Sequence, residues 1–344
     1  MHVGVFGAGA IGCFMGIRLS AAGTKVTLLG RARLVEAAER LSAVPQQGPA
    51  VTPAADMVVS DDPAALSSVD VCLLTVKSGA TADAAKTLAD VLPPHCVVVS
   101  MQNGLENPPL LRSALTQPIA AGMVSYNVFR DESPQAERYV QATSGPLMAE
   151  RQRGPAAQVM EGLREAFGRA GEELSLHDDL ESVAAGKLLL NLNNGICAAT
   201  GLTIAESLRS RDARWCFGAC MREGVAVLKQ TGPKPANVIG IPPFIIARML
   251  SLPNFIVTRV AKGMVNVDPS ARSSTLQDVL AGRRTEIGAL NGAIVALAKQ
   301  AGRPAPANAT VTKLVEGLHG RTPPPFVTPR GLRAEIERAI DTAR

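Results

Sequence analysis

The sequence predicts an α/β domain with a parallel, doubly wound sheet, followed by an all-α domain. Three observations support this prediction. The chain opens with an apolar run that ends in glycines spaced G-x-G-x-x-G. Strand-like and helix-like stretches then alternate, whereas from Leu180 onward the pattern is almost wholly helical. A length of 344 residues suits two domains, which we divide into residues 1–178 and 179–344.

The opening stretch has the pattern of a dinucleotide-binding turn of the Rossmann type. Val3–Phe6 reads as a short buried strand, and a helix-like segment follows the glycines. Gly7 would allow a tight turn, Gly9 a close approach to a pyrophosphate, and Gly12 close packing of helix on strand. The start of the helix would offer free N–H groups to the phosphates. We therefore assign cofactor binding to Gly7, Gly9, Ala10, Ile11 and Gly12.

The second strand, Thr24–Leu29, ends beside two arginines. An enzyme that binds NAD is expected to carry an acidic residue about 20 residues beyond the glycines, where it holds the ribose 2′-hydroxyl. This chain has Arg31 and Arg33 instead, and a guanidinium binds a 2′-phosphate with charge-assisted hydrogen bonds. The pattern favours NADPH, with Arg31 as a cofactor contact. The alternative is a solvated surface arginine.

Two further polar positions follow strand ends. Lys77 comes after the strand Val71–Val76, and Asn103 comes after the strand Val97–Ser100. Ligands of doubly wound sheets bind at the carboxyl ends of the strands, so Arg31, Lys77 and Asn103 would share one cleft. A solvated loop lysine and a plain Asn-Gly turn are the alternatives.

The remaining elements of the first domain have weaker signals in the sequence. We expect a short strand at 57–59, helices near 79–91, 105–115 and 154–171, and strands around 119–128, 139–141 and 146–149.

The second domain is predicted to consist of helices. Their expected ranges are 181–199, 204–230, 243–251, 274–301, 307–319 and 330–342. Thr203-x-x-Glu206 and Ser274-x-x-Gln277 have the pattern of capping boxes.

Composition excludes several classes of function. The net charge is +5 with scattered basic residues, and only 3% of residues are aromatic, which argues against nucleic-acid binding. The longest uncharged stretch is too polar to span a membrane. Six cysteines without C-x-x-C spacing are interpreted as buried thiols in a reducing compartment. We therefore expect a cytoplasmic protein without a signal peptide or a metal site; the sequence does not give the oligomeric state, for which a homodimer is our working expectation.

The apolar segment Ala184–Gly195 carries one lysine and several amides. On a helix of ~100° per residue, Asn191 lies ~40° and Asn194 ~20° from Lys187, on opposite sides of it. Burial beside leucines disfavours the charged form of a lysine, which makes it useful for acid–base chemistry. A lysine that extends to solvent along a helix surface is the alternative.

A second polar cluster runs from Arg272 to Gly292. Ser274 is a candidate for the N-cap of a helix, and its hydroxyl and neighbouring N–H groups could also bind a carboxylate. Glu286 begins an apolar helical stretch, and a surface salt bridge with Arg283 or another base is its alternative role.

Together these motifs resemble the ketopantoate reductase (2-dehydropantoate 2-reductase) family. The resemblance rests on the glycine turn and Lys77, on Gln102-Asn103-Gly104, on Lys187-x-x-x-Asn191, and on Ser273-Ser274-x-Leu276-Gln277-Asp278 followed by Arg284-Thr285-Glu286-Ile287. It covers nearly the whole chain in the right order, and the lysine helix with the later serine segment is its most specific part.

The resemblance implies reduction of the 2-keto acid 2-dehydropantoate to pantoate with NADPH, on the route to pantothenate and coenzyme A. It implies that Lys187 is the catalytic acid and Glu286 its acidic companion. It further implies substrate or nicotinamide contacts at Asn103, Asn191 and Ser274, and cofactor contacts at Arg31 and Lys77.

The chain departs from the family pattern at two positions. Gly195 stands where the family often has a second asparagine, for which the neighbouring Asn194 would substitute. Ala271 stands where the family often has another asparagine. Both positions belong to the expected substrate pocket, so a relative that acts on another 2-keto acid stays open as an alternative. An NADPH-binding sensor without chemistry is a third possibility.

Ordinary carbonyl chemistry gives the expected mechanism. Hydride transfer to the keto carbon develops negative charge on the carbonyl oxygen, which an ammonium group stabilises and protonates. With the cofactor on the first domain and Lys187 on the second, the active site is expected in the interdomain cleft.

Overall fold

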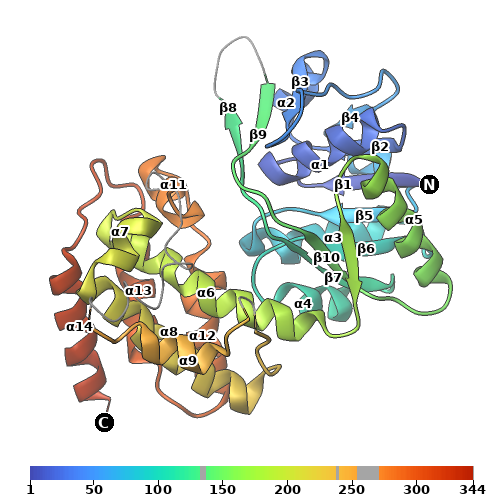
Figure 1. The fold of residues 1–344 in the computed structure, drawn as a ribbon. Coiled ribbons are helices and arrows are strands. Elements are labelled where there is room, and N and C mark those ends of the chain that lie inside the picture. The colour runs from blue at the N-terminus through green and yellow to red at the C-terminus, as the bar shows by residue number, and fades with distance from the viewer. Residues whose placement is uncertain (132–136, 238–239, 254–270, 344) are drawn as a thin grey trace. The chain divides into compact units, whose positions relative to one another are not determined.

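Figure 1 shows a computed structural model of the protein, which describes residues 1–131, 137–237, 240–253 and 271–343. The chain forms two compact units, Met1–Leu180 and Glu181–Arg344. The first unit is built from strands and helices, and the described part of the second is helical. The predicted combination of a Rossmann-type domain and an all-α domain is therefore confirmed.

A sheet of eight strands forms the centre of the first unit. Its spatial order is β11 (Leu174–His177), β10 (Leu147–Glu150), β7 (Ile119–Val124), β6 (Val97–Ser100), β5 (Val71–Leu74), β1 (His2–Phe6), β2 (Lys25–Leu29) and β4 (Val58–Ser60). Strand β1 pairs in parallel with both β2 and β5, and the strand order reverses between β1 and β5. Strand β10 runs antiparallel to β7, so the sheet predicted as parallel is mixed toward this edge.

A second, smaller sheet of three strands also belongs to the first unit. Its order is β3 (Leu41–Val44), β9 (Glu137–Gln141) and β8 (Val128–Asp131). The expected single strand at 119–128 is divided between the two sheets, because β7 ends at Val124 and β8 begins at Val128. Strand β3 was not predicted, because its four residues, LSAV, are too few for a clear alternating pattern.

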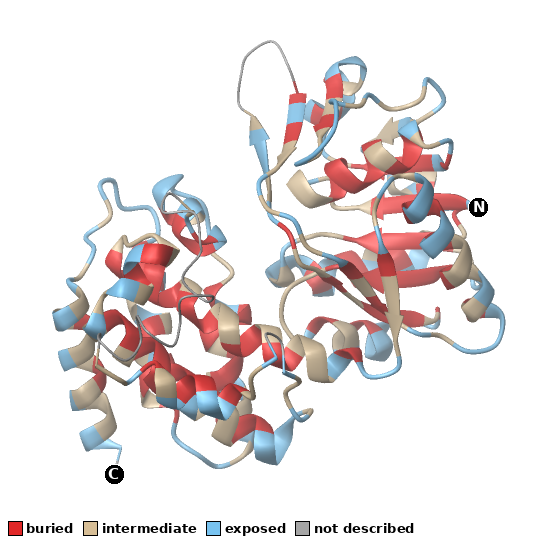
Figure 2. Ribbon diagram, viewed as in Figure 1, coloured by how far each residue is buried: buried red, intermediate tan, exposed pale blue. Residues whose placement is uncertain are grey.

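Helices cover both faces of the large sheet. They are α1 (Ala10–Ala21), α2 (Ala32–Glu36), η1 (Ala38–Arg40), η2 (Pro63–Leu66), η3 (Ser78–Ala80), α3 (Thr81–Val91), α4 (Asn107–Ala114) and α5 (Pro155–Arg169). One hydrophobic core contains Phe14 of α1 and Phe167 of α5, and the other contains Leu88 of α3 and Leu111 of α4. The central strands are buried on both faces, as Figure 2 shows.

Helices of the second unit surround α8. They are α6 (Leu180–Thr200), α7 (Ile204–Arg209), α8 (Arg211–Thr231), α9 (Pro243–Met249), α11 (Ser274–Leu280), η4 (Ile287–Ala289), α12 (Asn291–Gln300), α13 (Pro306–Glu316) and α14 (Pro329–Thr342). Helix α8 packs against α7, α9, α12, α13 and α14. This core is built largely from small and aliphatic side chains, in agreement with the low aromatic content.

Two helices expected to be continuous are interrupted. The predicted helix 204–230 consists of α7 and α8, because the side chain of Ser210 accepts a hydrogen bond from the backbone of Ala213 and starts a new helix. The capping box of Thr203 and Glu206 at the start of α7 is confirmed.

The predicted helix 274–301 breaks after α11. Gly282 has a φ of 64°, a left-handed conformation that ends a helix. The expected capping box at Ser274 is wrong. Ser273 is the N-cap, because its hydroxyl accepts a hydrogen bond from the Leu276 backbone, and Ser274 is the first helical residue.

All six cysteines are free and buried, as predicted. Within the described ranges, no helix is both long and apolar enough to cross a membrane. That same part of the chain contains no cluster of His, Cys, Asp or Glu that could hold a metal ion.

Candidate functional site

The glycine turn between β1 and α1 has the geometry that its sequence predicts. Gly7 has a φ of 97°, and a Cβ atom there would lie 2.7 Å from the backbone nitrogen of Val76. At Gly12 a Cβ atom would lie 2.8 Å from the carbonyl oxygen of Gly7, so helix and turn are in close contact. A Cβ at Gly9 would meet only that same oxygen, at 3.9 Å. Gly7 is therefore required by backbone conformation and Gly12 by packing, whereas Gly9 leaves open space beside the turn.

The start of α1 is suited to bind phosphate. Gly9 is its N-cap and offers no side-chain cap, and the first turn holds no acidic residue. Gly9 is exposed, while Ala10 and Ile11 are half-buried. The N–H groups of a first helical turn have no partner within the helix, and the helix dipole is positive there. These residues fit the pyrophosphate of a dinucleotide.

Hydrogen bonds join the strand ends that border this turn. The backbone N–H groups of Gly7 and Ala8 both donate to the carbonyl oxygen of Leu29, at the end of β2. The hydroxyl of Thr75, after β5, donates to the carbonyl oxygen of Gly7 at 2.6 Å. The turn is thus fixed at the point where the strand order reverses, which is the usual ligand site of such sheets.

The loops after β5 and β6 hold Lys77 and Asn103 at the same edge. The hydroxyl of Ser78 donates to the carbonyl oxygen of Asn103 at 3.1 Å, and the side-chain amide of Asn107 donates to it at 2.7 Å. Lys77 is exposed immediately before η3, and Asn103 is half-buried. The two loops therefore form one connected structure within the first unit.

The two arginines after β2 lie in different surroundings. Arg31 is exposed at the N-cap of α2 and makes no ion pair within the described residues. Arg33 forms two hydrogen bonds to the carboxylate of Glu137 on β9. Only the sequence position linked Arg33 to the cofactor, and no signal in the sequence pointed to Glu137, which is far along the chain.

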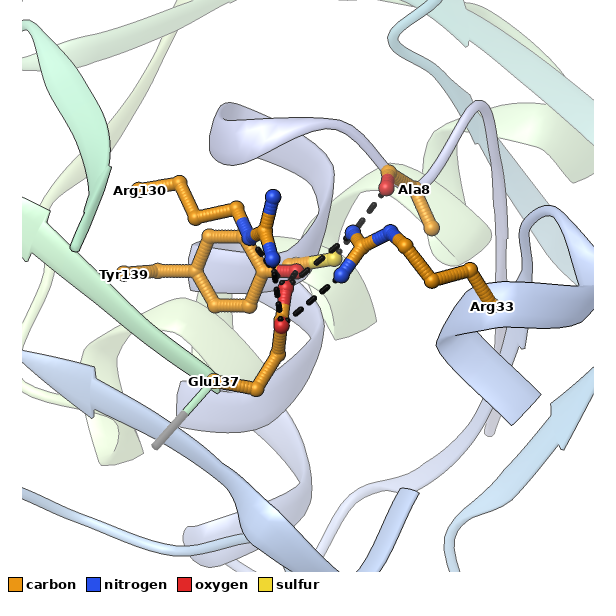
Figure 3. A network of polar contacts seen from close by, with 6 residues as sticks. Ala8, Arg33, Arg130, Glu137 and Tyr139 are labelled. Carbon is orange, nitrogen blue, oxygen red and sulfur yellow. Dashed lines mark hydrogen bonds and ion pairs between the residues drawn. The ribbon is translucent and has the colours of Figure 1, made fainter. Parts of the chain in front are cut away.

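The carboxylate of Glu137 is the centre of a polar cluster, shown in Figure 3. It accepts hydrogen bonds from Arg33 of α2, Arg130 of β8 and Tyr139 of β9. Burial opposes the ionisation of this carboxyl group, but the three donors outweigh that effect and lower its pKa to about 2. Glu137 is therefore ionised throughout the neutral range.

In the second unit, α6 carries Lys187, Asn191 and Asn194 on one stripe. All three are half-buried, whereas most of the apolar residues around them are fully buried. Burial lowers the pKa of Lys187 to about 8, and the negative charge of Glu286 opposes this shift. The lysine and Glu286, half-buried just before η4, are thus electrostatically coupled.

Ser273, and not Ser274 as expected, caps the start of α11. Ser273 is 2% exposed and its hydroxyl donates to the carbonyl oxygen of Asn194 at 3.5 Å, which connects α11 to α6. Ser274 is exposed. Its hydroxyl is not used as the cap, so it stays available to a ligand.

The position of Gly195 is filled by neighbouring side chains. A Cβ atom there would lie 2.4 Å from Oδ1 of Asn291 and 2.7 Å from Val311. A side chain at this position would therefore clash in this chain. Ala271 is half-buried, and its carbonyl oxygen accepts a hydrogen bond from the backbone of Ile204.

The predicted site residues thus form two sets. The first unit holds the glycine turn, Arg31, Lys77 and Asn103 at the carboxyl edge of one sheet. The second unit holds the stripe of α6 with Glu286 and the start of α11.

Comparison with known families gives matches over most of the chain. Residues 3–148 match the family model "Ketopantoate reductase PanE/ApbA", and residues 179–319 match the model "Ketopantoate reductase PanE/ApbA C terminal".

Individual relatives agree with these matches. The chain is 27% identical over 325 residues to a 2-dehydropantoate 2-reductase of Halobacterium salinarum, with 92% of this chain and 98% of the relative covered. A crystal structure of a PanE/ApbA family ketopantoate reductase from Ralstonia eutropha is 30% identical, has a TM-score of 0.75, and matches over 92% of this chain and 98% of its own.

The fold is shared more widely. A D-mandelate dehydrogenase, solved with NADH and anilino(oxo)acetate, has a TM-score of 0.72 at 20% identity, over 92% of this chain and 98% of its own.

Proposed function

This chain belongs to the ketopantoate reductase family of oxidoreductases, and we propose that it reduces 2-dehydropantoate to pantoate with NADPH, in the synthesis of pantothenate and coenzyme A. The observation that carries the proposal is the half-buried Lys187, whose pKa is lowered to about 8 beside Glu286. A general acid works best when its pKa lies near the working pH.

Cofactor binding is assigned to the first unit. The glycine turn and the first turn of α1 would hold the pyrophosphate, and the exposed Arg31 would bind the 2′-phosphate. Lys77 and Asn103 would contact the cofactor from the neighbouring loops. When bound, the reduced nicotinamide supplies the hydride that is added to the keto carbon.

Proton transfer is assigned to the second unit. The ammonium group of Lys187 stabilises the developing charge on the substrate oxygen and then donates its proton there. Glu286 favours the charged form of the lysine, and with a pKa of about 8 most of the population is protonated at neutral pH. Asn191 and Asn194 lie on the same stripe and would orient the substrate by hydrogen bonds, and Ser274 would bind its carboxylate.

A second candidate is the reduction of another branched 2-keto acid by the same residues. Gly195 favours it, because the packing around this glycine leaves no room for a side chain that could contact the substrate. Proton transfer from Lys187 would be the same, and only the branched group of the 2-keto acid would differ.

Replacement of the lysine tests the proposal. Lys187→Ala is expected to reduce turnover of 2-dehydropantoate by about 10²–10⁴-fold, the usual contribution of a general acid. The dissociation constant for NADPH, measured by fluorescence titration, should stay within about twofold of the wild-type value, because binding and proton transfer use different residues.

Lys313→Ala is the matched control, since Lys313 is an exposed lysine on α13 of the same unit. It should retain full turnover. Unchanged turnover in Lys187→Ala would remove the lysine from the mechanism.

A further inference from the structure

Two arginines share one carboxylate beside the glycine turn. Arg33 binds Glu137 with its Nη1 and Nη2 atoms, at 2.8 and 3.2 Å. Arg130 binds the same carboxylate with Nε at 2.7 Å and Nη2 at 3.0 Å. The hydroxyl of Tyr139 donates a further hydrogen bond to this carboxylate at 2.7 Å. Both guanidinium groups therefore approach one anion in a forked geometry that fixes their orientation.

This cluster is anchored in the core and connected to the turn. Tyr139 is 2% exposed, and its hydroxyl contacts the buried thiol of Cys13 on α1. That thiol donates to the carbonyl oxygen of Ala8, inside the glycine turn. Figure 3 shows Arg33 and Arg130 approaching the Glu137 carboxylate from different sides.

The charge of the cluster is not balanced. Glu137 supplies one negative charge and the arginines two positive charges, so one positive charge remains. The Glu137 side chain is 6% exposed, whereas those of Arg33 and Arg130 are 53% and 39% exposed. The excess charge therefore faces solvent while its counter-ion is covered.

A purely structural role explains only part of this arrangement. One arginine would neutralise Glu137 and attach β9 to α2. The second arginine leaves one positive charge beyond the charge that Glu137 neutralises, and Arg31 precedes Arg33 by two residues at the start of α2. An anion bound at these arginines would be stabilised by that charge. Among the described contacts, Nη1 of Arg130 makes no hydrogen bond, so this arginine retains donors for such an anion.

We propose that Arg33 and Arg130, held in place by Glu137, form a phosphate-binding pair that joins Arg31 in recognising the 2′-phosphate of the cofactor. Glu137 is then a positioning residue, and strands β8 and β9 contribute to cofactor selectivity through Arg130 and Glu137. The inference rests on the proposed use of NADPH. It adds a residue from a second sheet to a phosphate site that is otherwise assigned to the loop after β2.

Nucleotide fragments test the pair without requiring turnover. Calorimetric titration of the full-length protein compares 2′,5′-ADP, which carries the 2′-phosphate, with 5′-AMP, which does not. Arg33→Ala and Arg130→Ala are each expected to lower the affinity for 2′,5′-ADP by about tenfold to a hundredfold. This is the usual effect of losing a charge-assisted hydrogen bond. Binding of 5′-AMP should change by less than about twofold.

Arg138→Ala is the matched control. Arg138 follows Glu137 on β9 and is exposed on the opposite face of the strand, so its loss changes the net charge equally. It should leave both affinities unchanged. Arg130→Lys keeps the charge but loses the forked geometry, and we expect it to lower the affinity for 2′,5′-ADP as well. Glu137→Gln should lower the ratio of the two affinities, a readout that a merely structural role would not move.

The outcomes separate this inference from the proposed function. In one outcome the wild type prefers 2′,5′-ADP and Arg31→Ala abolishes that preference, but Arg33→Ala and Arg130→Ala bind both nucleotides as Arg138→Ala does. This outcome rejects the arginine pair and retains the use of NADPH. If the wild type binds both nucleotides equally, the use of NADPH fails and the pair fails with it.

Discussion

At the scale of single residues, Lys187 is central to the proposed function. A lysine on a helix surface would have an ordinary pKa and would be fully charged at neutral pH. Burial in α6 lowers the pKa of Lys187 to about 8, and Glu286 limits the decrease. The group can therefore both donate and accept a proton near neutral pH, as a reversible reductase requires.

This pKa predicts opposite pH dependences for the two directions of the reaction. Reduction needs the ammonium form, so its kcat should fall about tenfold per pH unit above about pH 8. Oxidation of the hydroxy acid needs the neutral amine, so its kcat should fall below the same pH. Steady-state rates of reduction and of oxidation, measured between pH 6 and 10, test both pH dependences. A reduction rate that stays constant up to pH 10 would argue against Lys187 as the acid.

Glu137 predicts a pH-dependent contribution to stability. Its pKa is lowered to about 2, below the ordinary value, so ionised Glu137 stabilises the folded state above the unfolded pKa of about 4.5. This contribution decreases as pH falls from about 4.5 to 2. Glu137→Gln should lower the free energy of unfolding by ~1–3 kcal/mol at pH 7.

Urea unfolding at pH 7 and at pH 3 checks this prediction. The difference between the wild type and Glu137→Gln should be smaller at pH 3, and a difference that is constant with pH would show that charge is not its source.

At the scale of elements, the turn from β1 into α1 could be predicted because it depends on local rules. Its backbone conformation and its close packing both call for glycine, and the spacing of these glycines is visible in the sequence. The Glu137 cluster could not be predicted, because it joins α2 to β8 and β9 across about a hundred residues of sequence. Only the folded chain brings these side chains together.

The ends of the helices in the second unit were also only partly predictable from the sequence. Periodicity indicated where they run but not where they are interrupted, because Ser210 and Gly282 are common inside helical patterns as well. The choice of Ser273 over Ser274 as the N-cap depends on burial. Ser273 is covered by α6, to whose Asn194 carbonyl its hydroxyl donates.

Two alanine substitutions separate packing from ligand binding at the glycine turn. Gly12→Ala places a methyl group 2.8 Å from the Gly7 carbonyl oxygen, so it should lower the free energy of unfolding by ~1–3 kcal/mol. Gly9→Ala meets no close atom in the protein and should fold normally, but its methyl group would stand where the pyrophosphate is proposed to bind.

Thermal unfolding and NADPH titration measure the two effects. We expect Gly9→Ala to keep the wild-type Tm and to lose at least tenfold in affinity for NADPH. Normal NADPH binding by Gly9→Ala would place the pyrophosphate elsewhere.

At the scale of the whole molecule, the proposed function is divided between the two units. The first has the sheet edge and turn that fit a dinucleotide, and the second has the coupled lysine and glutamate. Each unit matches its own family model. The family membership thus agrees with the chemistry of both units, while recognition of the substrate is proposed to rest on a few side chains on α6 and α11.

The most direct test of the proposed function is the rate of NADPH oxidation with 2-dehydropantoate, compared with a panel of branched 2-keto acids. The proposal predicts that kcat/KM is highest for 2-dehydropantoate. A clear preference for another 2-keto acid would contradict the proposed substrate, and no oxidation with any of them would contradict the proposed activity.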